Sequence, residues 1–84
     1  MTVSFAENVN FRLTLASAQK GKSYKIKEIK GGMRLHRRLL DMGLTAGTSV
    51  YVAARAVGGG AVLVSLRGVF IALRDTAASV VVLY

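Results

Sequence analysis

The sequence predicts a mainly β domain, a small five-stranded and partly open barrel with one short helix inserted after its first strand. Five short segments carry the alternating or continuous apolar pattern of strands, and glycine-rich turns separate them. One segment instead has the spacing of an amphipathic helix. The chain of 84 residues is 52% hydrophobic, which fits a single domain with a modest core, and without cysteine no disulfide can supplement that core.

The strand segments are short and regularly spaced. We predict strands at 23–30, 49–56, 61–67, 69–74 and 79–84. In the first of them, Tyr24 and Ile26 alternate with lysines, and the apolar phase then shifts to Ile29. Such a shift predicts a β-bulge at which the strand bends. Gly58, Gly59 and Gly60 lie between the second and third segments and predict a hairpin loop. Closure into a barrel is favoured because it also hides strand edges.

The predicted helix covers 33–42 and has a defined end. Leu35, Leu39 and Met42 fall on one narrow face and are expected to point into the core. Gly43 follows at the position where a helix often ends in a left-handed residue, which glycine adopts without steric cost. Leu44 is then placed to close back on Leu39. Gly47 and Gly68 mark two further turns.

Two other stretches complete the chain, an N-terminal extension and a short helical turn. Residues 1–14 form an N-terminal extension, which either adds an edge strand or is a loose segment, and residues 15–84 form the barrel domain. Residues 75–78, between the last two strands, predict a single helical turn capped by Asp75.

Positive charge is concentrated in one part of the chain. The formal net charge is +8, and eight of the twelve basic residues lie between positions 20 and 38, opposed only by Glu28. Such a field favours an acidic protein surface, nucleic acid or anionic lipid as partner. The alternative is a solvated face that keeps an apolar small domain in solution.

The residue types needed for catalysis or metal binding are scarce. Four carboxylates are widely separated, His36 is the single histidine, and cysteine is absent. We therefore predict no catalytic site, no cofactor and no metal site within one chain, while a metal site shared between subunits stays open. Gly21-Lys22-Ser23 imitates the end of a phosphate-binding loop, but position 16 is alanine where that motif needs glycine.

The helix also offers a candidate binding surface. Met33, His36 and Leu40 lie away from the core-facing stripe and beside Arg37. An apolar spot with a cationic rim is a typical docking feature. We predict a partner-binding surface from Met33, Arg34, His36, Arg37, Arg38 and Leu40. The alternative is that neighbouring strands cover the apolar side chains.

The chain also resembles a known family. The residues that carry the resemblance are Arg38-Leu39-Leu40-Asp41-Met42-Gly43-Leu44 followed by Gly47-Thr48, and Gly68 followed by Ile71-Ala72-Leu73-Arg74. This succession, from about residue 15 to residue 84, is similar to the FeoA family of bacterial ferrous iron transport accessory proteins. Ala46 stands where the family often has proline.

The resemblance implies an SH3-like barrel and a non-catalytic cytoplasmic protein that assists a membrane ferrous iron permease carrying a GTP-binding domain. The hypothesis is that the helix and the turn after it dock on the cytoplasmic part of that permease, with Arg34, Arg37, Arg38 and Leu40 in contact. The runner-up is a nucleic-acid-binding small barrel, which the charge favours. Against it, the basic helix offers no aromatic side chain for base stacking.

Two further expectations concern membranes and assembly. The longest uncharged run, 42–54, has thirteen residues with two glycines, which is too short to span a bilayer. No secretory signal is expected at the N-terminus. Segment 61–67 is apolar on both faces, so self-association into a homo-oligomer is one option.

Overall fold

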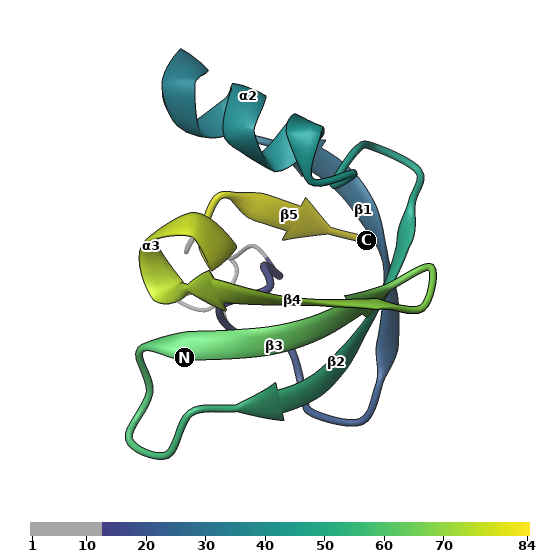
Figure 1. Ribbon diagram of the computed structural model, residues 1–84, viewed down its shortest axis with the longest axis vertical. Coiled ribbons are helices and arrows are strands. Elements are labelled where there is room, and N and C mark those ends of the chain that lie inside the picture. The colour runs from purple at the N-terminus through teal and green to yellow at the C-terminus, as the bar shows by residue number, and fades with distance from the viewer. Residues whose placement is uncertain (1–12) are drawn as a thin grey trace, which may run out of the picture.

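The computed structural model describes residues 13–84. It contains five strands and two helices, and the predicted mainly β fold with one inserted helix is confirmed (Figure 1). In chain order the elements are β1 (Ser23–Ile29), α2 (Met33–Asp41), β2 (Ser49–Arg55), β3 (Ala61–Leu66), β4 (Val69–Arg74), α3 (Asp75–Ala78) and β5 (Val81–Leu83). Most of the expected extension, residues 1–12, lies outside the described residues.

All five strands form one antiparallel sheet in the order β4-β3-β2-β1-β5. The first half of β1 pairs with β2 and the second half pairs with β5, and the register shifts between Ile26 and Glu28. The predicted bulge is therefore present. Because the bulge bends β1, one strand can join two neighbours that lie on different sides of the barrel. β4 and β5 are not paired with each other, so the barrel is partly open.

The segment before β1 closes one side of this barrel. Thr14 forms a bridge with Val82 of β5, and the N–H of Leu15 donates to the carbonyl of Val81. Leu15 is fully buried. The Arg55 guanidinium then holds the following turn, because it donates hydrogen bonds to the carbonyl oxygens of Leu15, Ala16 and Ala18.

The core lies inside the barrel and is almost entirely aliphatic. It includes Leu15, Ile26, Leu39, Leu44, Val50, Val52, Val62, Val64, Leu73 and Val81. In β3 every second residue is buried, as the period of two along a strand requires. Leu39 is the one residue of α2 that is fully enclosed in this core, at 1% exposure.

Two predictions about local packing are wrong. Met42 was expected in the core but is 38% exposed, because α2 ends at Asp41 and Met42 lies at its rim. Asp75 was expected to cap the turn that follows it. The N-cap residue of α3 is instead Arg74, which makes no side-chain cap, and Asp75 Oδ2 accepts a hydrogen bond from the Gly60 N–H at 2.9 Å.

Candidate partner-docking surface

Glycines fix both ends of α2. Gly31 has φ +95°, and a Cβ on it would lie 3.2 Å from Val80 Cγ1, so the chain enters the helix close against the loop before β5. At the other end, the N–H of Leu44 donates to the Leu39 carbonyl at 3.0 Å, and that of Gly43 donates to the Leu40 carbonyl at 2.9 Å. This pair of hydrogen bonds is the Schellman motif. The predicted helix stop is therefore confirmed.

The helix presents different side chains on its two faces. Leu35 and Leu39 face the barrel, while Met33 and Leu40 lie on the outer face and are 85% and 42% exposed. His36 is half-buried and Arg37 is exposed. Met33, His36, Arg37 and Leu40 together line a shallow hollow of about 230 Å³. We call these four residues the outer α2 surface.

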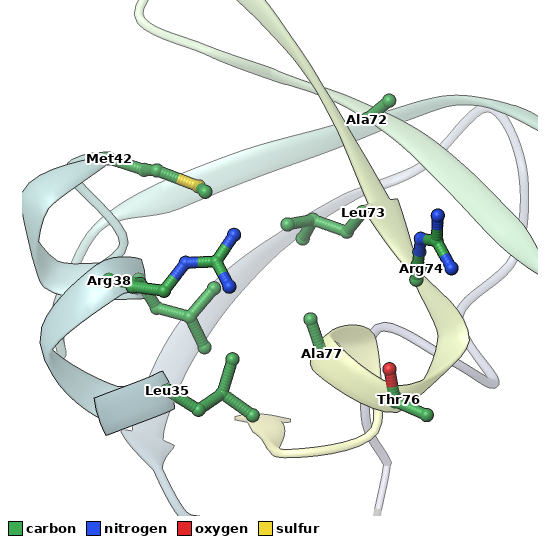
Figure 2. Close-up of a pocket in the computed structure, with 9 residues that line it drawn as sticks. Leu35, Arg38, Met42, Ala72, Leu73, Arg74, Thr76 and Ala77 are labelled. Carbon is green, nitrogen blue, oxygen red and sulfur yellow. The ribbon is translucent and has the colours of Figure 1, made fainter. Parts of the chain in front are cut away.

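The other predicted site residues lie elsewhere on the helix. Arg34 is exposed and is not part of the outer α2 surface. Arg38 lines a second hollow, between α2, β4 and α3, which it shares with Arg74 and Thr76 (Figure 2). Sequence reasoning did not assign a role to Arg74 or Thr76, because their separation from Arg38 in the chain gave no sign that they line the same hollow. The structural turn residues Gly43, Gly47 and Gly68 all have positive φ.

The basic stretch is exposed along β1 and α2. The eight basic side chains between positions 20 and 38 are exposed. Within residues 13–84 one ion pair is present, between Lys30 Nζ and Glu28 Oε2 at 3.6 Å. Lys27 Nζ lies 5.9 Å from the centre of the Tyr84 ring. Most of the positive charge in this region is therefore not neutralised by the described part of the chain.

The described residues contain neither a metal-binding cluster nor a membrane-spanning helix. No group of three or more histidine, cysteine or acidic side chains gathers within residues 13–84. Neither helix in this range has the length and apolarity needed to cross a bilayer. Tyr24, on β1, is half-buried, and its hydroxyl accepts a hydrogen bond from the Gln19 N–H at 2.9 Å.

These features define a small SH3-like barrel with a helix inserted after its first strand, and the helix carries an exposed apolar surface with a cationic surround. A family model for the FeoA domain matches residues 13–83. The chain belongs to the FeoA domain family.

Solved structures agree with this assignment. A FeoA-like protein from Clostridium acetobutylicum is 25% identical, with a TM-score of 0.79 over 87% of this chain and 85% of that chain. A protein described as an iron uptake regulatory protein, FeoA, is 26% identical, with a TM-score of 0.77 over 88% and 96%.

A third structure is FeoA of Stenotrophomonas maltophilia in complex with zinc, which is 28% identical, with a TM-score of 0.76 over 86% of this chain and 89% of that chain. It is described as a prokaryotic SH3 domain protein and as a candidate ferrous iron transport activating factor. None of the curated proteins compared with this chain matches it.

Proposed function

We propose that this chain is a non-catalytic, cytoplasmic accessory protein of ferrous iron uptake. It docks through the outer α2 surface on the cytoplasmic GTP-binding part of a ferrous iron permease. The iron-uptake role rests on the FeoA family and on the descriptions of its solved members. The observation that carries the docking role is the exposed pair Met33 and Leu40, which share one hollow with Arg37.

Energetics favour an apolar contact at the centre of this interface. Full burial of a methionine or leucine side chain contributes about 1.5–3 kcal/mol. Micromolar affinity corresponds to about 8 kcal/mol. Met33, which is almost fully exposed, and the exposed part of Leu40 can therefore supply a substantial share of a transient interaction. The surrounding cations contribute mainly to the rate of association and to the choice of an acidic partner surface.

The test is co-purification from the organism that encodes the chain. The tagged protein is captured from detergent-solubilised, nuclease-treated cells, and the proteins retained at moderate salt are identified. We expect a membrane permease with a GTP-binding domain. Leu40→Glu should abolish its recovery, because a carboxylate would be buried in the apolar contact. Arg37→Glu should weaken recovery most strongly at low salt, where charge interactions are least screened.

Val57→Glu serves as the matched control. Val57 is a fully exposed apolar residue next to the β2–β3 hairpin loop, and it does not line the outer α2 surface. Its substitution adds the same charge and should leave recovery of the permease unchanged. Retention of the permease by Leu40→Glu would contradict docking through this surface. Recovery of nucleic acid from an untreated sample, without any membrane partner, would favour the nucleic-acid-binding alternative.

A further inference from the structure

The second hollow lies on the open side of the barrel, between α2 and the end of β4. It has a volume of about 280 Å³. Leu35, Leu73 and Ala77 provide apolar lining, and Arg38 and Arg74 provide its charge (Figure 2). The two arginines come from different elements, and in Figure 2 Leu73 lies between them. The hollow is distinct from the outer α2 surface, with which it shares no residue.

The two guanidinium groups are available to a ligand. Both arginines are exposed, and neither takes part in the ion pair found within residues 13–84. The acidic residue nearest to Arg74 along the chain, Asp75, uses its Oδ2 to accept the Gly60 N–H. The one nearest to Arg38 is Asp41, and the two form no ion pair. A guanidinium presents several N–H donors in one plane, and two of them match the oxygens of a carboxylate. The apolar lining weakens the competition from water for such a pair.

A free strand edge runs beside this hollow. β4 pairs with β3 along its whole length, and no strand of the described chain pairs with its other edge. Ala72, Leu73 and Arg74 of β4 line the hollow. β4 contains no proline, and its one charged residue, Arg74, stands at its end, so the rest of the edge has none of the residues that usually protect an edge from pairing. Such an edge can accept an extended peptide as an additional strand.

We propose that this hollow binds a carboxylate side chain from an extended acidic segment of a protein partner, whose backbone pairs with the free edge of β4. Arg38 and Arg74 hold the carboxylate from two sides, and the strand edge aligns the segment. An acidic peptide is favoured because the ligand must complement two arginines without acidic partners on a chain of net charge +8. The proposal does not depend on the identity of the permease.

The test is an NMR titration of the ¹⁵N-labelled full chain. The ligand is a six-residue peptide of alternating threonine and glutamate, capped at both ends, and the threonine–glutamine peptide is its neutral counterpart. We expect the acidic peptide to shift the backbone amides of Ala72, Leu73 and Arg74. The neutral peptide should bind at least fivefold more weakly. Arg38→Gln and Arg74→Gln should each weaken the acidic peptide about fivefold, as the loss of one exposed charge pair predicts.

Arg34→Gln is the matched control, because it removes the same charge from the same helix at an exposed residue that lines neither hollow. It should change the affinity less than twofold. A peptide with N-methylated backbone amides should bind more weakly, since it cannot complete a strand ladder. Dispersed spectra of each variant will show that it is folded.

Four results would overturn the proposal. Equal binding of the neutral peptide would mean that the carboxylate is not recognised. An equal loss with Arg34→Gln would mean that only the overall charge matters. If inorganic phosphate at matched ionic strength shifts the same amides with the same affinity, or if N-methylation has no effect, the hollow is a simple anion site rather than a peptide site.

Discussion

Gly60 and Asp75 are joined by two reciprocal hydrogen bonds. The Gly60 N–H donates to Asp75 Oδ2 and the Asp75 N–H donates to the Gly60 carbonyl oxygen, both at 2.9 Å. The pair connects the β2–β3 hairpin to the start of α3, and it thereby fixes the end of β4 at the hollow that Arg74 lines.

Asp75→Ala should lower the free energy of unfolding by about 1 kcal/mol, the usual net value of one hydrogen bond. The loss is moderated because the other oxygen, Oδ1, is buried without a donor among residues 13–84, and the substitution removes that cost as well. Urea denaturation measures the change. Asp41→Ala, which removes an exposed carboxylate from α2, should stay within about 0.5 kcal/mol of the unmodified protein. Equal effects of both substitutions would contradict this role for Asp75.

Arg55 is predicted to be a structural residue rather than a partner-binding one. Its guanidinium donates to three carbonyl oxygens in the turn at residues 15–18, including that of Ala18 at 2.7 Å. Arg55→Ala should cost about 1.5–3 kcal/mol, the range for hydrogen bonds from a charged group. The free energy of unfolding of Arg55→Lys should lie between those of the unmodified protein and of Arg55→Ala, because an ammonium cannot reproduce the planar fork of the guanidinium. The urea midpoint measures the stability of both variants. Arg34→Ala, at an exposed residue, is the control. A loss of stability with Arg34→Ala as large as that with Arg55→Ala would argue against a structural role for Arg55.

Gly43 and Gly32 make a matched pair of glycines at the two ends of α2. Gly43 has φ +95°, and a Cβ on it would lie 3.1 Å from Leu66 Cδ2. Gly43→Ala should therefore destabilise the protein by about 1–2 kcal/mol. Gly32 has φ −71° and open space around its Cα, so Gly32→Ala should cost only about 0.5 kcal/mol, the difference between glycine and alanine at an N-cap. Similar thermal midpoints for the two variants would mean that the left-handed helix stop is not required.

Leu39 and Leu40 are neighbours in the chain with opposite roles. Leu39 is enclosed in the core, and Leu39→Ala should cost about 2–5 kcal/mol. Leu40 lies on the outer α2 surface, and Leu40→Ala should cost less than about 1 kcal/mol. Chemical denaturation of the two variants checks the difference. A large loss with Leu40→Ala would show that Leu40 supports the fold, and its use as a docking probe would then be compromised.

Local features of the fold could be predicted because their signals are local. The helix stop needs a glycine at position 43 and an apolar residue at position 44, and both lie within five residues of Leu39. The bulge in β1 was visible as a change of apolar phase between Ile26 and Ile29. In each case the sequence spacing itself determines the geometry, since backbone periodicity decides which side chains share a face.

Features that depend on distant parts of the chain could not be predicted. The position of Asp75 predicts a helix cap, but its carboxylate accepts a hydrogen bond from the Gly60 N–H, fifteen residues earlier in the chain. Met42 has the spacing of a core residue, yet nothing in the spacing says that the barrel ends before it. Arg38 and Arg74 line one hollow because the fold places the end of β4 beside α2.

The anchoring of α2 by one enclosed side chain, Leu39, separates the requirements of folding from those of recognition. Substitutions on the outward half of the helix change what the domain can bind while the barrel beneath keeps its free energy of unfolding. One barrel can therefore acquire new binding preferences during evolution without passing through unstable intermediates. The helix is then the part of the domain in which related proteins with different partners should diverge first.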